Sequence, residues 1–294
     1  MKTITETVKS GKVLVSDGAW GTFLHEKGLA IGECPELWCV THETDVLDIA
    51  QSYVNAGADM VESNSFGANR FKLSHWGLEP RCAEINRAAA EISRQAAGPK
   101  RHVIASIGPT GKILMMGDVT DEEIYDAFKK QAVALEEGGA DACCIETMTA
   151  LDEACLAIKA ARDNTKLEII CTFTFDRTID GLYRTMMGVS PQEFAKAAVE
   201  AGAHIIGTNC GSGMARMIEI VRELRAADAT SPILVHANAG LPQNADGGGI
   251  VFPETPAMMA AMVPECVAAG ANIIGGCCGT TPLHISAIVK AVRT

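Results

Sequence analysis

Three cysteines in the second half of the chain combine residue type and spacing in a way that suits metal chemistry. Cys277 and Cys278 are adjacent in the segment GGCCGT (275–280), and Cys210 lies in the segment NCG (209–211). A disulfide between neighbouring cysteines would be strained, and the flanking glycines let the backbone bend tightly. Three thiolates favour zinc, and three protein ligands with a free fourth position are typical of a catalytic site. The residue types alone favour three packed thiols over a metal site.

Three polar residues stand where apolar stretches end. Glu146 closes the apolar run 142–145, Asp17 begins the turn DGAWGT (17–22), and Asn238 follows the run that ends at Ala237. A carboxylate after an apolar run must be paired or reach solvent, and Asp before Gly often forms a turn. Each residue is a candidate functional residue, with a solvated strand end or a plain turn as the alternative.

These candidates belong to an internal repeat. Four segments start with Gly-Ala and a polar residue and continue into an apolar run: GADMVESNS (57–65), GADACCIET (139–147), GAHIIGTNC (202–210) and GANIIGGCC (270–278). Gly suits the left-handed end of a helix, and a continuous apolar run is typical of a parallel strand covered on both faces. The repeat therefore predicts four junctions at which a helix ends and a buried strand begins.

Four further stretches have the pattern of strands and alternate with the repeats: 12–17, 102–108, 168–175 and 232–238. Capping patterns predict helices that begin after Thr120, Ser190, Thr255 and Thr281. Eight strands, each followed by a helical stretch, predict an α/β protein with a single (β/α)8 TIM-barrel domain over residues 1–294. A doubly wound open sheet is the alternative, but the chain lacks the Gly-rich dinucleotide loop expected there.

In a (β/α)8 barrel the catalytic groups lie where strands end and the following loops begin. Alignment of the repeats on their first glycine places Glu146 and Cys277 at one equivalent position, and Cys210 and Cys278 at the next. Cys210 would then end the sixth strand and Cys278 the eighth. Because these strands are two apart around the ring, their side chains can converge over the barrel mouth, which strengthens the interpretation as a metal site.

The composition argues against several classes of partner. The chain has 36 acidic and 25 basic side chains, and a net charge of −11 disfavours nucleic acid and anionic membranes. It has neither an apolar run of transmembrane length nor a signal-peptide core near Met1, so we expect a cytoplasmic protein. In that setting disulfides are not expected, and packed core thiols are predicted at Cys143, Cys144, Cys155, Cys171 and Cys266.

Four motifs occur in the order and spacing of a known family: DGAWGT (17–22), GTNC (207–210), HANAGLP (236–242) and GGCCGT (275–280). Together they resemble the homocysteine S-methyltransferase family over nearly the whole chain. That family includes the homocysteine-binding module of cobalamin-dependent methionine synthase, the betaine enzyme and the S-methylmethionine enzyme. The segments SIGPTG (106–111) and GECPELW (32–38) are similar to the methionine synthase branch, whereas ESNSFGAN (62–69) departs from the family's Thr-rich version.

The resemblance implies a zinc ion on Cys210, Cys277 and Cys278, which would act in catalysis through the metal. It also implies that Asn238 holds the fourth zinc position until substrate displaces it. The implied activity is methyl transfer to the thiolate of homocysteine, which gives methionine.

The same resemblance implies the contacts to the rest of the substrate. Asp17 and Glu146 match family residues that hold the amino group of homocysteine. Gly18 and Ala19 belong to the backbone that lies near the substrate's carboxylate.

The methyl donor is left open by these motifs. No D-x-H-x-x-G occurs, so the chain lacks the usual lower-ligand motif of a corrinoid-binding domain. At 294 residues it is expected to lack the folate and corrinoid modules of a full methionine synthase. A separate methyl-corrinoid protein is the expected donor, and a small donor such as S-methylmethionine or betaine is the alternative. A non-catalytic zinc- or thiol-binding subunit of a methyltransfer complex is a further alternative, which the intact Asp17 and Glu146 disfavour.

Overall fold

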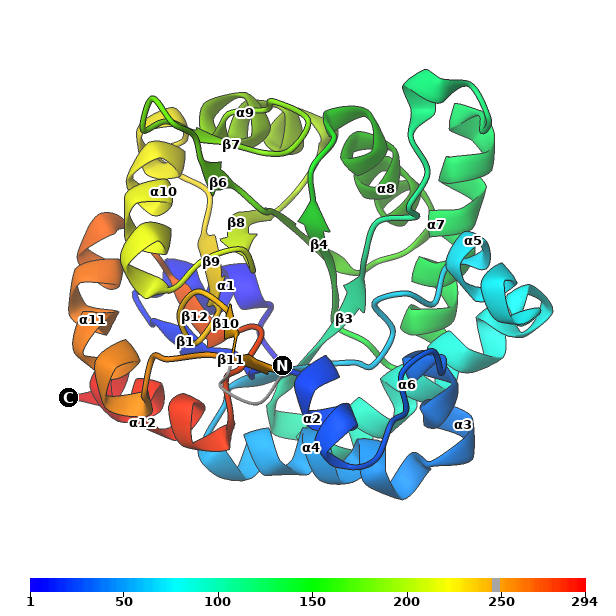
Figure 1. Ribbon diagram of the computed structural model, residues 1–294, viewed down its shortest axis with the longest axis horizontal. Helices are drawn as coiled ribbons and strands as arrows, with labels where there is room; N and C mark the ends of the chain where they lie inside the picture. The colour runs from blue at the N-terminus through cyan, green and yellow to red at the C-terminus, as the bar shows by residue number, and fades with distance from the viewer. Residues whose placement is uncertain (245–248) are drawn as a thin grey trace.

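A ring of eight parallel strands forms the centre of the protein, as the computed structural model shows for residues 1–244 and 249–294 (Figure 1). The strands of the ring are β1 (Leu14–Val15), β2 (Met60–Glu62), β3 (His102–Ile107), β4 (Ala142–Met148), β5 (Glu168–Phe173), β8 (Ile205–Asn209), β9 (Ile233–Ala237) and β12 (Ile273–Gly276). Their hydrogen-bonded order is β1–β12–β9–β8–β5–β4–β3–β2. The predicted TIM-barrel fold is therefore confirmed, and each of the eight predicted strands is present.

Helices cover the outside of the ring (Figure 1). The larger ones are α4 (Glu43–Ala56), α6 (Cys82–Ala97), α7 (Asp121–Glu137), α8 (Leu151–Asn164), α9 (Pro191–Ala201), α10 (Met214–Ala227), α11 (Pro256–Ala269) and α12 (Pro282–Arg293). The predicted capping residues begin four of them: the hydroxyls of Thr120, Ser190 and Thr255 accept from a backbone N–H in the first turn, and Thr281 forms a capping box with His284.

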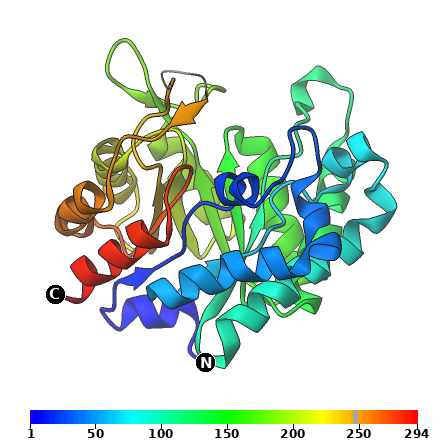
Figure 2. The same cartoon turned by 60° about the horizontal axis from the view of Figure 1, so that its bottom comes forward.

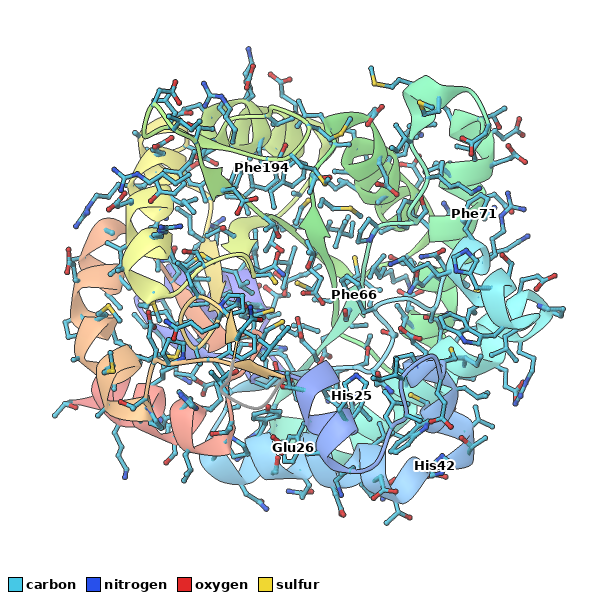
Figure 3. The ribbon with its side chains drawn as sticks, in the orientation of Figure 1. His25, Glu26, His42, Phe66, Phe71 and Phe194 are labelled. Atoms are coloured by element: carbon cyan, nitrogen blue, oxygen red, sulfur yellow. The ribbon has the colours of Figure 1, made fainter. Side chains whose placement is uncertain are left out.

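Two apolar layers hold the barrel together. Inside the ring, each strand contributes one buried residue and β4 contributes two, and the short helix α1 (Ile4–Lys9) closes the lower end with Ile4 and Val8. Between ring and helices, aromatic side chains pack closely: Phe194 of α9 stacks on Phe173 of β5 with ring centroids 4.2 Å apart (Figure 3). The lower end is thus filled, and a cavity opens toward the carboxyl ends of the strands.

The barrel closes between β1 and β2 without a regular ladder of backbone hydrogen bonds. The Asp59 N–H donates to the Val15 carbonyl at 2.7 Å. Three residues after Asp59, the Glu62 N–H donates to Oδ2 of Asp17 at 2.8 Å. The carboxylate of Asp17 therefore takes the place of a backbone carbonyl at this seam and fixes the end of β2.

Loops at the carboxyl ends of the strands rise above the barrel mouth (Figure 2). They carry three short helices: α2 (Gly21–Glu26), α3 (Trp38–Thr41) and α5 (Arg70–Leu73). They also carry two hairpins, β6 (Asp176–Arg177) with β7 (Tyr183–Arg184) and β10 (Gln243–Asn244) with β11 (Ile250–Val251), and 3-10 turns at Pro35–Leu37, Ser74–Trp76, Glu79–Arg81 and Leu114–Met116. A further 3-10 turn, Gly98–Lys100, precedes β3 at the opposite end of the barrel. No helix in the described ranges is long and apolar enough to cross a membrane.

Candidate metal centre

The three predicted cysteines meet at one point above the barrel. Parallel pairing aligns Asn209 with His236, and Ala237 with Gly276, so the ends of β8, β9 and β12 lie side by side. The sulfur of Cys278 lies 4.0 Å from the sulfurs of both Cys210 and Cys277. All three sulfurs lie within 4.8 Å of one another. The expectation that strands six and eight bring their terminal cysteines together is met by the fold.

The backbone at the cysteines is held in an uncommon conformation. Cys210 has a positive φ of 59°, which costs free energy for a residue with a Cβ and is found mostly at functional sites. Its N–H donates to the His236 carbonyl at 3.0 Å, and the Cys277 N–H donates to the Ala237 carbonyl at 2.7 Å. A Cβ at Gly276 would lie 2.3 Å from Oγ1 of Thr280, so only glycine lets the chain turn here.

The three thiols titrate as one unit. Hydrogen bonds from Cys277 and Cys278 lower the pKa of the Cys210 thiol to about 3. The same bonds to Cys210 raise the pKa of Cys278 to about 12 and that of Cys277 well above its ordinary value. One thiolate is therefore stable without a cation, and release of the other two protons requires a positive charge among the sulfurs.

The spacing of the sulfurs fits a tetrahedral metal ion. A Zn–S bond of about 2.3 Å with tetrahedral angles places ligand sulfurs about 3.8 Å apart. The two distances of 4.0 Å are close to that value, and the third pair lies within 4.8 Å. The described cysteines form no disulfide. The triad is therefore suitable for a metal with soft ligands.

A cavity of about 280 Å³ opens beside the triad. Its wall includes all three cysteines, and also Gly18, Ala19, Trp20, Glu36, Glu62, Phe66, Ser106, Glu146, Thr147 and His236. Phe66, on the loop after β2, points in over the barrel mouth (Figure 3). A small molecule in this cavity could touch the metal position and the buried carboxylates together.

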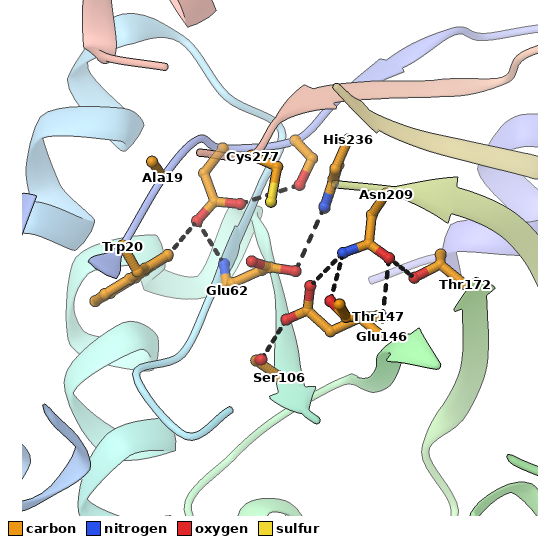
Figure 4. A network of polar contacts seen from close by, with 12 residues as sticks. Ala19, Trp20, Glu62, Ser106, Glu146, Thr147, Thr172, Asn209, His236 and Cys277 are labelled. Carbon is orange, nitrogen blue, oxygen red and sulfur yellow. Dashed lines mark hydrogen bonds and ion pairs between the residues drawn. The ribbon is translucent and has the colours of Figure 1, made fainter. Parts of the chain in front are cut away.

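Glu146 lies at the cavity wall at the end of β4, as predicted. Its side chain is buried, and it accepts hydrogen bonds from the Ser106 hydroxyl and, at 3.1 Å, from the Asn209 side-chain amide (Figure 4). Burial raises the pKa of the Glu146 carboxyl to about 7. The next residue, Thr147, has a positive φ of 60°, and its N–H donates to Oδ1 of Asn209 at 2.9 Å. The end of β4 is therefore fixed around this carboxylate.

Asp17 lies behind the cavity wall. It is fully buried, and its oxygens accept from the Trp20 indole N–H at 3.0 Å, the Ser16 hydroxyl at 3.1 Å and the Glu62 N–H (Figure 4). Burial raises the pKa of the Asp17 carboxyl to about 6. Asp17 does not line the cavity, unlike its neighbours Gly18 and Ala19. The Ala19 N–H donates to Oγ1 of Thr280 at 3.1 Å, which ties this turn to the cysteine loop.

Asn238 follows β9 directly, one residue beyond the strand. Its side chain lies near the Cys210 thiol and helps to lower the pKa of that thiol, and its Oδ1 is buried without a hydrogen-bond partner among the described residues. An unpaired buried amide oxygen beside three sulfurs is a suitable fourth donor atom for a metal ion. The geometry is therefore compatible with the predicted role of Asn238.

The family model for homocysteine S-methyltransferases matches residues 14–292. The chain belongs to the homocysteine S-methyltransferase family. The match extends from β1 into α12 and thus covers the whole barrel and the cysteine triad.

Individual relatives of this family member come from bacteria. The methionine synthases of Mycobacterium tuberculosis and Mycobacterium leprae are 33% and 32% identical to it. These matches cover 97% and 96% of this chain but only 25% and 24% of those proteins, so the chain spans about a quarter of their length. The metallated form of the Escherichia coli homocysteine methyltransferase MmuM shares the fold, with a TM-score of 0.79 at 21% identity over 98% of this chain and 99% of that chain.

Two buried residues of the homocysteine S-methyltransferase barrel are not among the site residues predicted from the sequence. Glu62 ends β2 and His236 lies in β9, and both line the cavity. Nδ1 of His236 lies 3.6 Å from Oε1 of Glu62 (Figure 4). The sequence signal was a charged residue that closes the apolar run Met60–Val61, and the repeat alignment passed over it because it selected Asn64 instead.

Proposed function

We propose that this protein is a zinc-dependent S-methyltransferase that transfers a methyl group to the thiolate of homocysteine. The observation that carries the proposal is the meeting of three cysteine sulfurs on one cavity wall with the buried carboxylate of Glu146. Homocysteine carries a thiol at one end and an ammonium at the other. The cavity offers a place for each within one small space.

Cys210, Cys277 and Cys278 would hold the zinc ion, with Asn238 as a displaceable fourth ligand. A zinc ion bound there supplies Lewis acidity that lowers the pKa of a coordinating thiol, which in water is about 8.5. The residues of the chain then have three tasks: they position the substrate sulfur, hold its ammonium, and keep the thiolate free of hydrogen-bond donors. With the substrate fixed at both ends, its sulfur can attack a methyl carbon in line.

The test is direct binding and turnover with purified, zinc-loaded protein. Homocysteine should bind and be converted to methionine when a methyl donor is supplied, and Glu146→Gln should weaken binding without loss of zinc. If the protein holds zinc but neither binds nor methylates homocysteine, the proposed acceptor is wrong. Glu153→Gln is a matched control, because Glu153 is also buried but accepts from Thr110 outside the cavity.

We further propose that the methyl donor is a methyl-corrinoid protein. Large apolar side chains are exposed on four loops at the barrel mouth: Ile31, Ile113, Met115, Met116, Ile179, Leu182, Met186, Leu241, Ile250 and Val251. These loops rise on opposite sides of the mouth (Figure 2). Exposed apolar side chains on several loops around one opening are suited to contact with another protein, and a small sulfonium or ammonium donor would not require them.

A panel of donors separates the alternatives. Methylcobalamin, a methyl-corrinoid protein, S-methylmethionine and betaine are each supplied with homocysteine, and methionine is measured. A corrinoid protein should be far more effective than free methylcobalamin at equal concentration, and Met115→Glu/Met186→Glu on the rim should reduce only that difference. Efficient turnover with S-methylmethionine or betaine would instead establish a small donor. Zinc and homocysteine binding without turnover from any donor would indicate a non-catalytic subunit.

A further inference from the structure

Glu62 presents an unpaired carboxylate oxygen to the cavity. Its side chain is 9% exposed, and Oε1 has no hydrogen-bond partner among the described residues. Nδ1 of His236 lies 3.6 Å from this oxygen, too far for a hydrogen bond. Nε2 of His236 is also buried without a hydrogen-bond partner in the described part of the chain. Glu62 and His236 thus each have a buried polar atom without a hydrogen-bond partner among the described residues.

Buried polar groups are expensive to leave unpaired, and such groups in native proteins usually await a ligand or an ion. Glu62, Glu146 and His236 each place one acceptor atom within 4.8 Å of the other two. No lysine or arginine lies among the residues that line the cavity within the described ranges. The three acceptors therefore suit a small cation with several N–H donors that comes from outside the protein.

Asp17 is the other carboxylate that the motifs suggest for this task, but its oxygens are already engaged. It accepts from Trp20, Ser16 and the backbone of Glu62, and it lies behind the cavity wall. The hydrogen bond from the Glu62 N–H explains its position. Asp17 holds the last residue of β2 in place, and that residue faces the cavity.

We propose that Glu62, together with Glu146, receives the ammonium group of the thiol substrate, and that Asp17 is a positioning residue for Glu62. The inference rests on the proposed function, because it takes homocysteine as the ligand. A ring nitrogen of His236 is the third acceptor for the three N–H donors of the ammonium. Amine recognition then comes from the ends of β2 and β4, opposite the cysteines of β8 and β12.

This arrangement makes Glu62 a determinant of specificity. 4-Mercaptobutanoate has the carbon skeleton, thiol and carboxylate of homocysteine but no amino group. It can reach the metal position and leaves Glu62 and Glu146 unpaired. Loss of charge-assisted hydrogen bonds costs about 1.5–3 kcal/mol, so wild-type protein should bind it roughly 10- to 100-fold more weakly than homocysteine.

The experiment compares both thiols on zinc-loaded wild-type protein and on Glu62→Gln by isothermal titration calorimetry. Glu62→Gln should weaken homocysteine binding roughly 10- to 100-fold and leave 4-mercaptobutanoate binding unchanged. Zinc content, measured by elemental analysis, should stay at the wild-type level. Glu153→Gln, a buried carboxylate outside the cavity, should bind both thiols as wild type does.

Several outcomes would overturn the assignment. Homocysteine binding to Glu62→Gln at wild-type strength removes Glu62 from recognition while the proposed function stands. Equal weakening of both thiols shows that Glu62 only supports the structure. A second zinc equivalent that is present in wild type and lost in Glu62→Gln shows that the cluster holds a metal instead. If wild-type protein holds zinc and binds no homocysteine, the proposed function fails first, and this inference fails with it.

Discussion

The preference for homocysteine over its amine-free analogue should depend on pH. Burial raises the pKa of the Glu146 carboxyl to about 7, and only the ionised form makes charge-assisted hydrogen bonds to an ammonium. A group with this pKa is roughly nine-tenths ionised at pH 8 and one-tenth ionised at pH 6. The ammonium of a free amino acid stays mostly protonated over this range. The ratio of the two binding constants should therefore fall roughly tenfold from pH 8 to pH 6.

Calorimetric titrations at half-unit pH steps measure this ratio. Both thiols lose their proton on binding, so that contribution cancels when homocysteine is divided by 4-mercaptobutanoate. In Glu146→Gln the ratio should vary less with pH than in wild type, with the remaining dependence due to Glu62, whose pKa burial also raises. At pH 8 the ratio should be lower than in wild type by roughly 10- to 100-fold. Glutamine can still accept from Asn209 at its oxygen and donate to Ser106 at its amide, so we expect the variant to fold.

Two results would refute this reasoning. A ratio that stays constant from pH 6 to pH 8 in wild-type protein would show that no carboxyl with a pKa near 7 contacts the ammonium. The same slope in Glu146→Gln as in wild type would assign the titration to another group. Glu153→Gln should reproduce the wild-type curve, since that carboxylate accepts from the Thr110 N–H and hydroxyl and does not line the cavity.

Three further predictions follow from the same contacts. Serine at any one of the three cysteines of the triad should abolish stoichiometric zinc in elemental analysis, while circular dichroism shows an intact fold. The metal-free protein should lose stability to urea as the pH rises from about 4.5 through about 7, because the folded state holds the Glu146 proton more tightly than the unfolded chain does; Glu146→Gln should flatten that profile. Asp17→Asn should lower the stability by about 1–3 kcal/mol in the same assay, because an amide cannot accept all three bonds made to the carboxylate; an unchanged midpoint would contradict its role at the β1–β2 seam.

The ring of strands could be predicted from the sequence because its signals are local. Each Gly-Ala segment joins a helix end to a buried strand, and Gly57, Gly202 and Gly270 have the positive φ expected at such ends. Continuous apolar runs indicated strands covered on both faces, and each is buried. Eight such units within 294 residues leave a closed barrel as the natural arrangement.

The triad could also be placed because repeat alignment gives the rim position of each strand. Cys210 and Cys278 fall at equivalent rim positions, and in the ring only β9 separates β8 from β12. The core thiols predicted at Cys143, Cys144, Cys171 and Cys266 are buried, and Cys155 is half-buried.

The partners of individual carboxylates could not be predicted in this way. Asp17 and Glu62 are 45 residues apart, and their hydrogen bond depends on how the first and second strands close the ring. A motif says which residue type stands at a strand end but not whether its oxygens face the cavity or the seam. The small hairpins at the mouth were missed for a related reason: β6 and β7 have two residues each, too few to show alternation.

The charge of the cavity unites these assignments. Three thiols lie on one side and two buried carboxyls on the other, and no lysine or arginine among the described lining residues balances them. Burial raises the pKa of both carboxyls, and the thiols share a single easily formed thiolate, so protons neutralise much of the charge that the cavity walls could carry. A divalent metal at the sulfurs and an ammonium at the carboxyls would displace those protons. The site is thus complementary to a metal ion at the sulfurs and an ammonium group at the carboxyls. A thiol can bind the metal through its sulfur and also contact the carboxyls as a cation only if it carries an amine.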